Sequence, residues 1–514
     1  MQKENKNSIF SKIYKFFESY RYLVQVLHGM LLTLAFHPFD IFIVIPVSFS
    51  GFLFYLERSF SNVKKTDTFK LGFIHGFLFF FGHFITSLYW LVIPLFTDIK
   101  RYWFLVPFAA IAAPAFLASF YGVCSGIICR AFFGNNNSKI NEKRRILLAI
   151  SFAVGFFISE ILRSHLIFSF PWNLLGYASG YSLALMQFAS ILGVYGLSLL
   201  LYMIGTIPYT RNPILISTIT AIVVMITANG RGRLNQMSYD TTKYNTLSLY
   251  LVQPNLSSHD KVGVAKELAK IKSLVETIPV SKTSRNFKLI LLPETGIPMV
   301  INRSQEFIFD DLMSKHSHNT FLISGVDTFS KETNEYFNSM IVVNNIGEIV
   351  DHYDKVILVP FGEYIPGFSL IKPFVSNYHT FSYGRKVRYF RLYNNFSEDG
   401  LVIMPTICFE SIFSPIVDNR YTIDLDLIVN VTNDSWLGNS IGAYQHLAMT
   451  RMRSIEYGVP LIRVAKTGIS AVFNSYGKLL RGIPLNTEVV MLVDIPENKT
   501  PTTYMKILNF FRRK

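Results

Sequence analysis

Charged residues are scarce in this chain. Asp, Glu, Lys and Arg together make up 16% of its 514 residues, whereas a soluble protein usually carries about 25%. Hydrophobic residues make up 50%, 47 of them phenylalanine, and they gather before about residue 230. This pattern excludes a wholly soluble protein and predicts two regions that face different solvents.

Cysteine is almost absent. Of the three cysteines, Cys124 and Cys129 lie in an apolar stretch and are interpreted as packing residues, while Cys408 lies in the more polar half. The sequence contains no disulfide framework and no Cys/His cluster with metal-ligand spacing. We therefore expect no metal site and no soluble cofactor.

Acidic residues are outnumbered by basic ones, 34 against 49, which gives a net charge of +15. The basic residues do not follow one stripe. Many sit between apolar stretches, as in Lys64-Lys65 and Lys143-Arg144-Arg145. This is the pattern of membrane topology, so we expect no nucleic-acid partner.

Apolar stretches that approach the roughly 20 residues needed to cross a bilayer fill the first half. They lie at 23–38, 40–57, 71–96, 102–129, 146–168, 182–206 and 213–230. The first two are short and are joined by His37-Pro38-Phe39-Asp40, which suits a tight hairpin. We predict a transmembrane domain of about seven helices over residues 23–231, after a basic tail, 1–22, that lacks a signal-peptide cleavage site.

The loops between these stretches alternate in basic charge. Arg58, Lys64 and Lys65 follow the second stretch, and five basic residues lie between 130 and 145. The loop before the second stretch has no Lys or Arg, and the loop after the third has only two. Because basic loops stay in the cytoplasm, we expect a cytoplasmic N-terminal tail and everything after about residue 232 outside.

A polar connector, 232–246, leads into short β-rich runs separated by helical segments. The expected strands are 247–252, 289–292, 321–324, 340–343, 401–404, 427–431 and 471–473, and the expected helices are 263–278 and 443–457. This alternation predicts an α/β domain over residues 247–495. The tail, 496–514, is expected either to be frayed or to form a short helix on the membrane surface.

Three segments of the α/β domain carry groups suited to catalysis. LILLPETGIP, 289–298, places Glu294 where an apolar strand ends, which suits a general base. YDKVILVPFGEYIPG, 353–367, places Lys355 before an apolar run, where it suits an oxyanion stabiliser that lowers the pKa of a nearby thiol. LVIMPTICFESIF, 401–413, places Cys408 at a strand-to-helix turn, which suits a nucleophile held as thiolate.

Each of these residues also has a structural interpretation: a helix-capping carboxylate, a solvated lysine and a buried cysteine. Their combination at strand ends of one α/β domain favours catalysis, because it supplies a base, an oxyanion stabiliser and a nucleophile. The arrangement of Glu294, Lys355 and Cys408 resembles the nitrilase, or carbon–nitrogen hydrolase, superfamily. The resemblance implies an α/β nitrilase-like αββα sandwich domain attached to the multi-pass α-helical membrane domain.

Further segments narrow this resemblance to the apolipoprotein N-acyltransferases. In the α/β region these are VPFGEYIP at 359–366, NVTNDSWLG at 430–438 and QHLAMTRMRSIEYGVPLIRVAKTGIS at 445–470. In the membrane region they are FFISEILRSHLIFSFPWNLLGYASG at 156–180 and QFASILGVYGLSLL at 187–200. The resemblance covers about residues 20 to 495.

The resemblance implies a reaction in a bacterial inner membrane, with the catalytic domain periplasmic. A fatty acyl group would move from a membrane phospholipid to the α-amino group of the N-terminal diacylglyceryl-cysteine of an apolipoprotein. Cys408 would form a thioester, Glu294 would accept protons, and Lys355 would stabilise the oxyanion. Neither metal nor cofactor is implied.

Further positions match the family. Three residues near the triad are expected to support it: Glu363, Phe409 (where the family has tyrosine) and Glu410. Three others are expected either to contact substrate or to pack in a turn: Asn433, Asp434 and Trp436. His446 is expected to be structural.

The chain departs from the family at Leu292 and near Val262, where tryptophans are usual, and at Lys466, where asparagine is usual. The transmembrane helix that usually follows the α/β domain is not expected before Lys514. Two alternatives remain at this point: a membrane-tethered nitrilase-type amidase, and a non-catalytic scaffold or transporter. An intact Glu–Lys–Cys set favours an enzyme, and seven apolar stretches favour lipid substrates.

Overall fold

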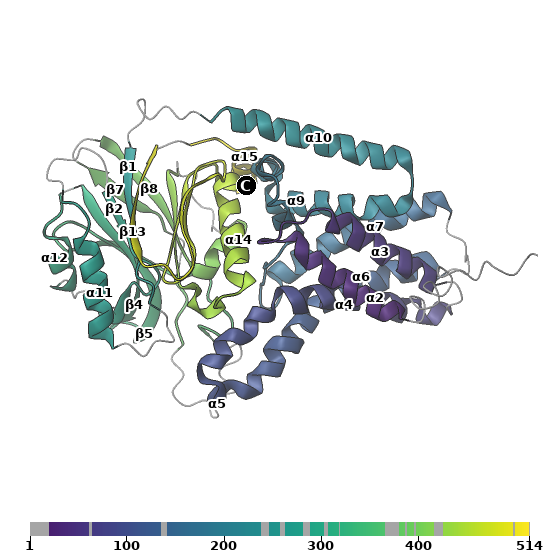
Figure 1. Ribbon diagram of the computed structural model, residues 1–514, viewed down its shortest axis with the longest axis horizontal. Coiled ribbons are helices and arrows are strands. Elements are labelled where there is room, and N and C mark those ends of the chain that lie inside the picture. The colour runs from purple at the N-terminus through teal and green to yellow at the C-terminus, as the bar shows by residue number, and fades with distance from the viewer. Residues whose placement is uncertain are drawn as a thin grey trace, which may run out of the picture. The chain divides into compact units, whose positions relative to one another are not determined.

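The computed structural model describes residues 20–60, 64–134, 141–237, 246–256, 263–280, 288–302, 307–317, 319–364, 380–385, 388–394, 397–415, 425–496 and 499–512. The chain forms two compact units (Figure 1). The helical unit comprises Met1–Phe188 and Val194–Arg231, and the α/β unit comprises Gly232–Lys514 with Ala189–Gly193. Most of the predicted tail, 1–22, and most of the predicted connector, 232–246, lie outside the described residues.

The apolar first half is helical. Its α-helices are α2 (Arg21–Leu32), α3 (Val44–Ser59), α4 (Thr68–Ser87), α5 (Ile99–Tyr102), α6 (Ala113–Phe133), α7 (Glu142–His165), α8 (Leu183–Met186), α9 (Ala189–Thr206) and α10 (Pro213–Asn235). Shorter helical turns connect them: η1 (Thr33–Ala35), η2 (Lys65–Asp67), η3 (Tyr89–Asp98), η4 (Trp103–Leu105), η5 (Phe108–Ala112), η6 (Leu175–Ser179) and η7 (Ile207–Thr210).

Five helical segments among the described residues are long and apolar enough to cross a membrane: Lys65–Ser87, Trp103–Phe133, Glu142–His165, Ala189–Thr210 and Pro213–Asn235. They correspond to the third through seventh predicted stretches, so the predicted multi-pass helical domain is confirmed. The first two stretches form the shorter α2, of 12 residues, and α3, of 16 residues, which pack against each other. The third stretch leaves the α-helix after Ser87, and Pro94 lies in the turn that follows.

Small residues let α4 and α6 pack closely. A Cβ atom on Gly76 would lie 2.0 Å from Ser125 Oγ, and one on Gly72 would lie 2.6 Å from the Cβ of Cys129. Helices in membranes commonly pack through such small residues, because the backbones can then approach each other. Cys129 is buried at this contact, which confirms its interpretation as a packing residue.

The second half contains two sheets. The first runs β13-β1-β2-β4-β5-β6, with β3 beside β4, and the second runs β12-β11-β10-β9-β8-β7. The strands are β1 (Thr246–Gln253), β2 (Lys288–Leu291), β3 (Ile297–Asn302), β4 (Thr320–Ser330), β5 (Glu335–Val343), β6 (Ile349–Asp354), β7 (Phe390–Asn394), β8 (Ser397–Ile407), β9 (Leu427–Thr432), β10 (Leu461–Ala465), β11 (Ser470–Phe473), β12 (Leu479–Ile483) and β13 (Val489–Pro496).

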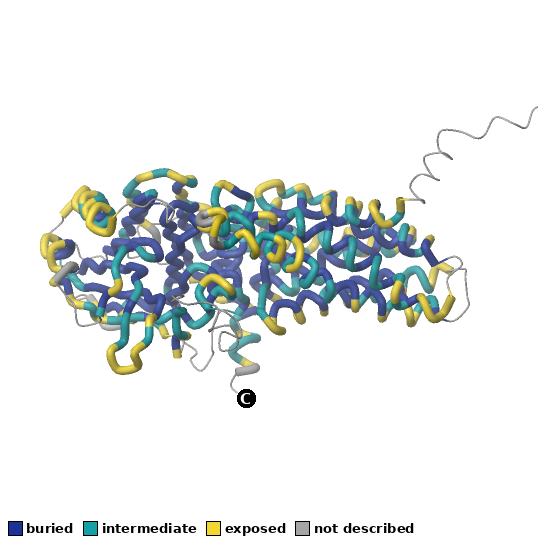
Figure 2. Tube along the Cα trace, turned by 90° about the horizontal axis from the view of Figure 1, so that it is seen from below, coloured by how far each residue is buried: buried dark blue, intermediate teal, exposed yellow. Residues whose placement is uncertain are grey.

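The two sheets pack face to face. One buried cluster holds residues of both, for example Leu289 and Met340 from the first sheet and Ile403 and Val429 from the second. Helices α11 (Val264–Glu276) and α12 (Phe307–Met313) cover the other face of the first sheet, and α14 (Ile441–Tyr457) covers that of the second. Figure 2 shows the buried residues of the molecule in dark blue. The predicted αββα sandwich is therefore confirmed.

The chain ends in α15 (Thr503–Arg512), so this part of the predicted tail is an ordered helix rather than frayed. Tyr504 is buried, and its hydroxyl lies 2.9 Å from Ser414 Oγ. Ser414 in turn donates to the Glu456 carboxylate of α14. The last helix is thus anchored in the α/β unit beside the segment that follows Cys408.

Candidate active site

Glu294 lies in the turn after β2. Its side chain is buried, and three groups bind its two carboxylate oxygens. Oε1 accepts a hydrogen bond from Asn338 Nδ2 at 2.7 Å and lies 3.3 Å from Lys355 Nζ. Oε2 accepts one from the backbone N–H of Asn433 at 2.8 Å. The carboxylate is therefore fixed from three directions, as a positioned base must be.

Lys355 follows β6 and is only 1% exposed. Its Nζ lies 2.8 Å from Glu363 Oε1 and 3.3 Å from Glu294 Oε1. Burial alone would lower the pKa of Lys355, but the carboxylates of Glu294 and Glu363 outweigh burial and raise it above its usual value. Lys355 is consequently a permanent positive charge, not the solvated surface lysine that was the alternative interpretation.

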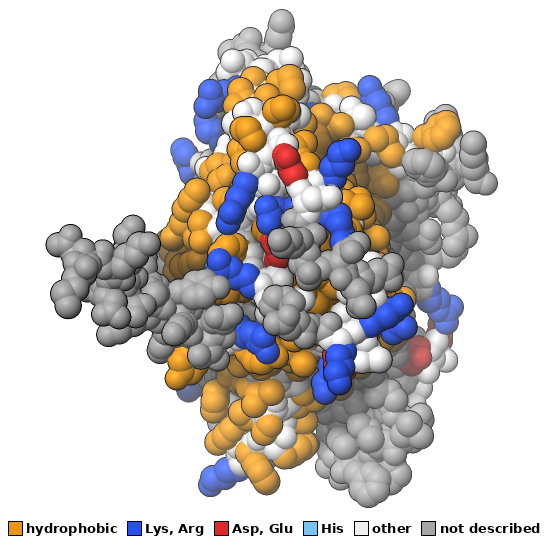
Figure 3. Space-filling model, turned by 90° about the vertical axis from the view of Figure 1, so that its right-hand side faces the viewer, with side chains coloured by type: hydrophobic (Ala, Val, Ile, Leu, Met, Phe, Trp, Pro, Cys, Tyr) orange, Lys and Arg blue, Asp and Glu red, His pale blue; other side chains and the backbone are white. Residues whose placement is uncertain are grey.

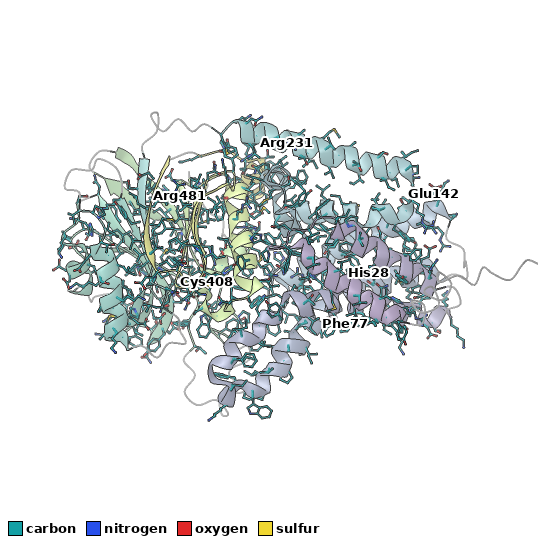
Figure 4. The ribbon with its side chains drawn as sticks, viewed as in Figure 1. His28, Phe77, Glu142, Arg231, Cys408 and Arg481 are labelled. Atoms are coloured by element: carbon teal, nitrogen blue, oxygen red, sulfur yellow. The ribbon has the colours of Figure 1, made fainter. Side chains whose placement is uncertain are left out.

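Cys408 lies at the end of β8, where the chain enters the short 3₁₀ helix η9 (Cys408–Ile412) beside α14 (Figure 4). Its φ is +50°, a left-handed conformation that costs a non-glycine residue about 1–2 kcal/mol. Backbone strain of this kind is typical of residues whose side chain must be aimed at a functional site. The predicted strand-to-helix turn is thus present.

The resting thiol of Cys408 is protonated. Burial raises its pKa, Glu294 raises it further, and the opposing effect of Lys355 is smaller. The prediction that this position favours the thiolate was wrong, because η9 is only five residues long and burial dominates. A neutral thiol requires a base at the moment of attack, and Glu294 is the carboxylate with the largest effect on its pKa.

Glu410 connects the turn that contains Cys408 to the segment that contains Lys355. Its Oε2 accepts a hydrogen bond from the N–H of Ile407 at 2.8 Å. Its Oε1 accepts from the N–H groups of Val356 and Ile357, at 2.7 and 3.1 Å, and from the Tyr353 hydroxyl at 2.8 Å. One buried carboxylate therefore sets both the chain before Cys408 and the chain after Lys355.

Both halves of the chain are similar to known protein families. Residues 28–207 match the apolipoprotein N-acyltransferase N-terminal domain, and residues 251–503 match the carbon-nitrogen hydrolase family. The apolipoprotein N-acyltransferase of Rhizobium rhizogenes is 31% identical over 492 residues, which cover 91% of this chain and 88% of the relative. That of Rickettsia prowazekii is 30% identical over 503 residues, 95% of each chain. The chain belongs to the apolipoprotein N-acyltransferase family.

This family membership makes the chain an acyltransferase and argues against the scaffold alternative. Among solved structures, Saccharomyces cerevisiae Nit3, a member of branch 10 of the nitrilase superfamily, is similar with 16% identity and a TM-score of 0.38. The match covers 52% of this chain and 94% of Nit3.

Two further residues that were expected to support catalysis adjoin the predicted triad of Glu294, Lys355 and Cys408. Glu363 binds Lys355 and Asn338 through Oε1, and its Oε2 accepts from the N–H of Val359 at 2.8 Å. Phe409 is buried, and the centroid of its ring lies 5.2 Å from that of Phe413 in an edge-to-face arrangement. Phe409 therefore has a packing role.

The structure divides the three residues that were expected to contact substrate or to pack in a turn into two groups. Asn433 binds Glu294 through its backbone, and Asp434 is buried against Arg463 and His446 at 2.5 and 2.9 Å. These two hold the site together from within the protein. Trp436 is 47% exposed, which leaves it as the one of the three that is accessible to a substrate.

Sequence reasoning missed Asn338 and Arg463. Asn338 bridges Glu294 and Glu363, while Arg463 pairs with Asp434. Arg463 sits in the otherwise apolar strand Leu461–Ala465, and a charge inside such a strand signals a buried ion pair. Asn338 had no such signal, because only the pairing of distant strands brings it to the site.

Proposed function

We propose that this chain transfers a fatty acyl group from a membrane phospholipid to the α-amino group of the diacylglyceryl-cysteine at the N-terminus of an apolipoprotein. The observation that carries the proposal is that Glu294 and Lys355 lie 3.3 Å apart and both act electrostatically on the strained Cys408. In this proposal Glu294, Lys355 and Cys408 act as base, oxyanion stabiliser and nucleophile.

The first half-reaction forms a thioester. Glu294 takes the thiol proton of Cys408 as the sulfur attacks the carbonyl carbon of the phospholipid acyl ester. The carbonyl oxygen becomes an oxyanion, which the ammonium of Lys355 stabilises. The carbon–oxygen bond to glycerol then breaks, Glu294 returns the proton to the departing alkoxide, and a lysophospholipid leaves.

The second half-reaction consumes the thioester. The neutral α-amine of the acceptor attacks the thioester carbon, and Lys355 again faces the oxyanion. The carbon–sulfur bond breaks, Glu294 carries the amine proton to the sulfur, and the amide product leaves with Cys408 restored as a thiol. Because one binding site serves donor and acceptor in turn, the kinetics should be ping-pong.

The location we propose is the bacterial inner membrane, with the α/β unit in the periplasm. The basic loops predicted to be cytoplasmic support this orientation, and Figure 3 shows a face on which Lys and Arg outnumber Asp and Glu. Among the described residues five segments can cross, and the α2–α3 hairpin would add either two crossings or none. An odd number of crossings in both cases would put the N-terminal tail and the α/β unit on opposite sides, in keeping with the proposal.

The test uses cells that depend on this chain for lipoprotein maturation. Mass spectrometry of lipoprotein N-termini should find a third acyl chain with the unmodified protein and only the diacyl form with Cys408→Ala. Purified full-length protein mixed with phospholipid should gain the mass of one acyl chain, labile to hydroxylamine, and release one lysophospholipid. A chain that hydrolyses small amides but forms no acyl-thioester from phospholipid would refute the proposal and favour the amidase alternative.

A further inference from the structure

Asp327 and Asn338 face each other across two antiparallel strands. They are directly paired in the register of β4 and β5, so their side chains lie on the same face of the sheet, with Cβ atoms about 5 Å apart. Asn338 Nδ2 donates to Glu294 Oε1 and to Glu363 Oε1. The face that carries Asp327 is therefore the face that carries the catalytic carboxylate.

Each of these two residues keeps one buried oxygen without a hydrogen-bond partner among the described residues, Asp327 Oδ1 and Asn338 Oδ1. Asn338 is only 4% exposed. A buried acceptor without a donor costs about 1–3 kcal/mol and is rare in native structures. Within the part of the chain that the structure describes, two such acceptors on paired residues beside Glu294 are available to a donor from a bound molecule.

The charge around these oxygens specifies the kind of donor. Among the described residues, the charged groups with the largest effects on the pKa of Asp327 are Glu294, Glu363, Lys466 and Lys355. Lys466 is itself paired with Glu267 at 3.3 Å. Four carboxylates against two ammonium groups leave a net charge of −2, so the site favours a cationic donor over a neutral one.

We propose that Asp327 Oδ1 and Asn338 Oδ1 bind the primary ammonium group of a substrate, which we assign to the N-terminus of the acceptor. This assignment rests on the proposed function, because only an acyl transfer to an amine brings an α-ammonium group to the thioester. Two acceptor oxygens match two N–H donors of the ammonium and hold its nitrogen beside Glu294.

Binding at this position also explains how the α-ammonium group of the acceptor loses its proton. An α-ammonium has a pKa of about 8 and cannot attack until it loses a proton. Burial, with Glu294 and Glu363, raises the pKa of Asp327 to about 6, although Lys466 and Lys355 oppose the rise. Asp327 is thus a carboxylate near neutral pH that can accept the first proton and pass it to solvent. The free amine then attacks, and Glu294 carries the second proton to the Cys408 sulfur as the carbon–sulfur bond breaks.

The experiment separates the two half-reactions in the full-length protein. Acyl-enzyme is formed from phosphatidylglycerol, which carries no amine, and is then mixed with a diacylglyceryl-cysteinyl peptide or with hydroxylamine, whose nitrogen is neutral at pH 7.

Asp327→Asn should leave thioester formation and hydroxylamine cleavage within about threefold of wild type. It should slow transfer to the peptide about 10- to 100-fold at pH 7, because asparagine keeps an acceptor oxygen but lacks the negative charge that strengthens the bond and takes up the ammonium proton. The defect should shrink at pH 9, where the amine is neutral. Asp494→Asn, on β13 of the same sheet, is the control and should behave as wild type.

Three outcomes overturn the inference. Equal losses in thioester formation, hydroxylamine cleavage and transfer would make Asp327 a structural residue. Unchanged transfer would remove it from the amine site. A defect in acylation from phosphatidylethanolamine but not from phosphatidylglycerol, with transfer intact, would assign the ammonium site to the donor head group instead. If wild-type acyl-enzyme reacts with hydroxylamine but never with the peptide, the proposed function itself fails.

Discussion

His446 Nε2 lies 3.3 Å from the backbone carbonyl oxygen of Cys408, and Nδ1 of the same ring lies 2.9 Å from Asp434 Oδ1. Burial lowers the pKa of His446, and Arg463 lowers it further, so the ring is neutral despite the carboxylate. With its one proton on Nε2, the neutral ring donates to the Cys408 carbonyl, while Nδ1 accepts from Arg463 Nη2 at 3.1 Å. This contact holds Cys408 in its strained conformation. His446 is therefore a positioning residue for Cys408, in agreement with the structural role expected from the sequence.

His446→Phe should slow thioester formation about 100-fold, the cost of a misplaced reacting group, while His446→Gln should recover part of the rate because its amide can still donate to the Cys408 carbonyl. The burst of lysophospholipid measures both. The pH dependence of the remaining activity should not shift, since the imidazole takes no proton in the reaction. A pH profile that loses a titration in both variants would make His446 an acid or base.

Cys408 offers a test of the strained turn that does not depend on activity. Cys408→Ala and Cys408→Gly should both be inactive. The glycine variant should be more stable than the alanine variant by up to about 1 kcal/mol, because glycine adopts φ +50° without the steric cost, partly offset by its more flexible unfolded chain. Thermal unfolding of the two solubilised variants gives the order directly. A clearly higher melting temperature for alanine would mean that the turn relaxes to a negative φ.

Glu294 and Lys355 should change the reactivity of the Cys408 thiol in opposite directions. Glu294 raises the pKa of Cys408 and Lys355 lowers it. Glu294→Gln should therefore lower that pKa and raise the thiolate fraction at a given pH, whereas Lys355→Met should do the reverse. Iodoacetamide alkylation of Cys408 followed from pH 7 to pH 10 reports the thiolate.

Both variants should nevertheless lose acyl transfer, since one lacks the base and the other the oxyanion stabiliser. Faster alkylation together with slower acylation in Glu294→Gln is the distinctive result, because general loss of structure would not produce it. Exposed Glu348, replaced by Gln, is the matched control. Alkylation profiles that coincide in the three proteins would remove both residues from the neighbourhood of the thiol.

The strands that the sequence predicted are mostly those with continuous apolar runs. The segments Leu289–Leu292 and Leu427–Val431 become buried strands because both faces of each sheet are covered, which leaves no polar position to break the run. Strand β12, Leu479–Ile483, was missed because it is the last strand of its sheet and much of it is exposed. An edge strand needs little apolar sequence, so it leaves a weak signal.

The three proposed catalytic residues were predictable for a related reason: Glu294 and Cys408 follow apolar strands, and Lys355 precedes an apolar run. Asp327 and Asn338 were not, because each is an ordinary polar residue inside a strand. They become neighbours of Glu294 only through the antiparallel register of β4 with β5, and such pairing is set by tertiary packing rather than by local sequence. The protonated state of Cys408 was missed for the same reason, since burial cannot be read from the residues next to it.

Arg463 forms a buried ion pair with Asp434. Its Nη2 lies 2.5 Å from Asp434 Oδ2, and both side chains are fully buried. Burial alone would raise the pKa of Asp434, but the Arg463 guanidinium holds it well below its usual value. Arg463→Met should therefore cost about 3–5 kcal/mol, because the substitution leaves a buried carboxylate without its cation.

The pH dependence of that loss has a definite sign. The folded pKa of Asp434 in the wild type lies below the unfolded value of about 3.9, so its contribution is complete above that value and is lost as pH falls through the folded pKa. In Arg463→Met the Asp434 pKa rises, and protonation then relieves the unpaired charge. The gap in melting temperature between wild type and variant should be widest near neutral pH and should narrow toward pH 4.

Asp434→Asn added to Arg463→Met should recover part of the loss in stability. Lys272→Met, which breaks the exposed pair with Asp311, is the control and should melt as wild type. A gap that stayed constant with pH would mean that Arg463 stabilises the fold by packing rather than by its charge.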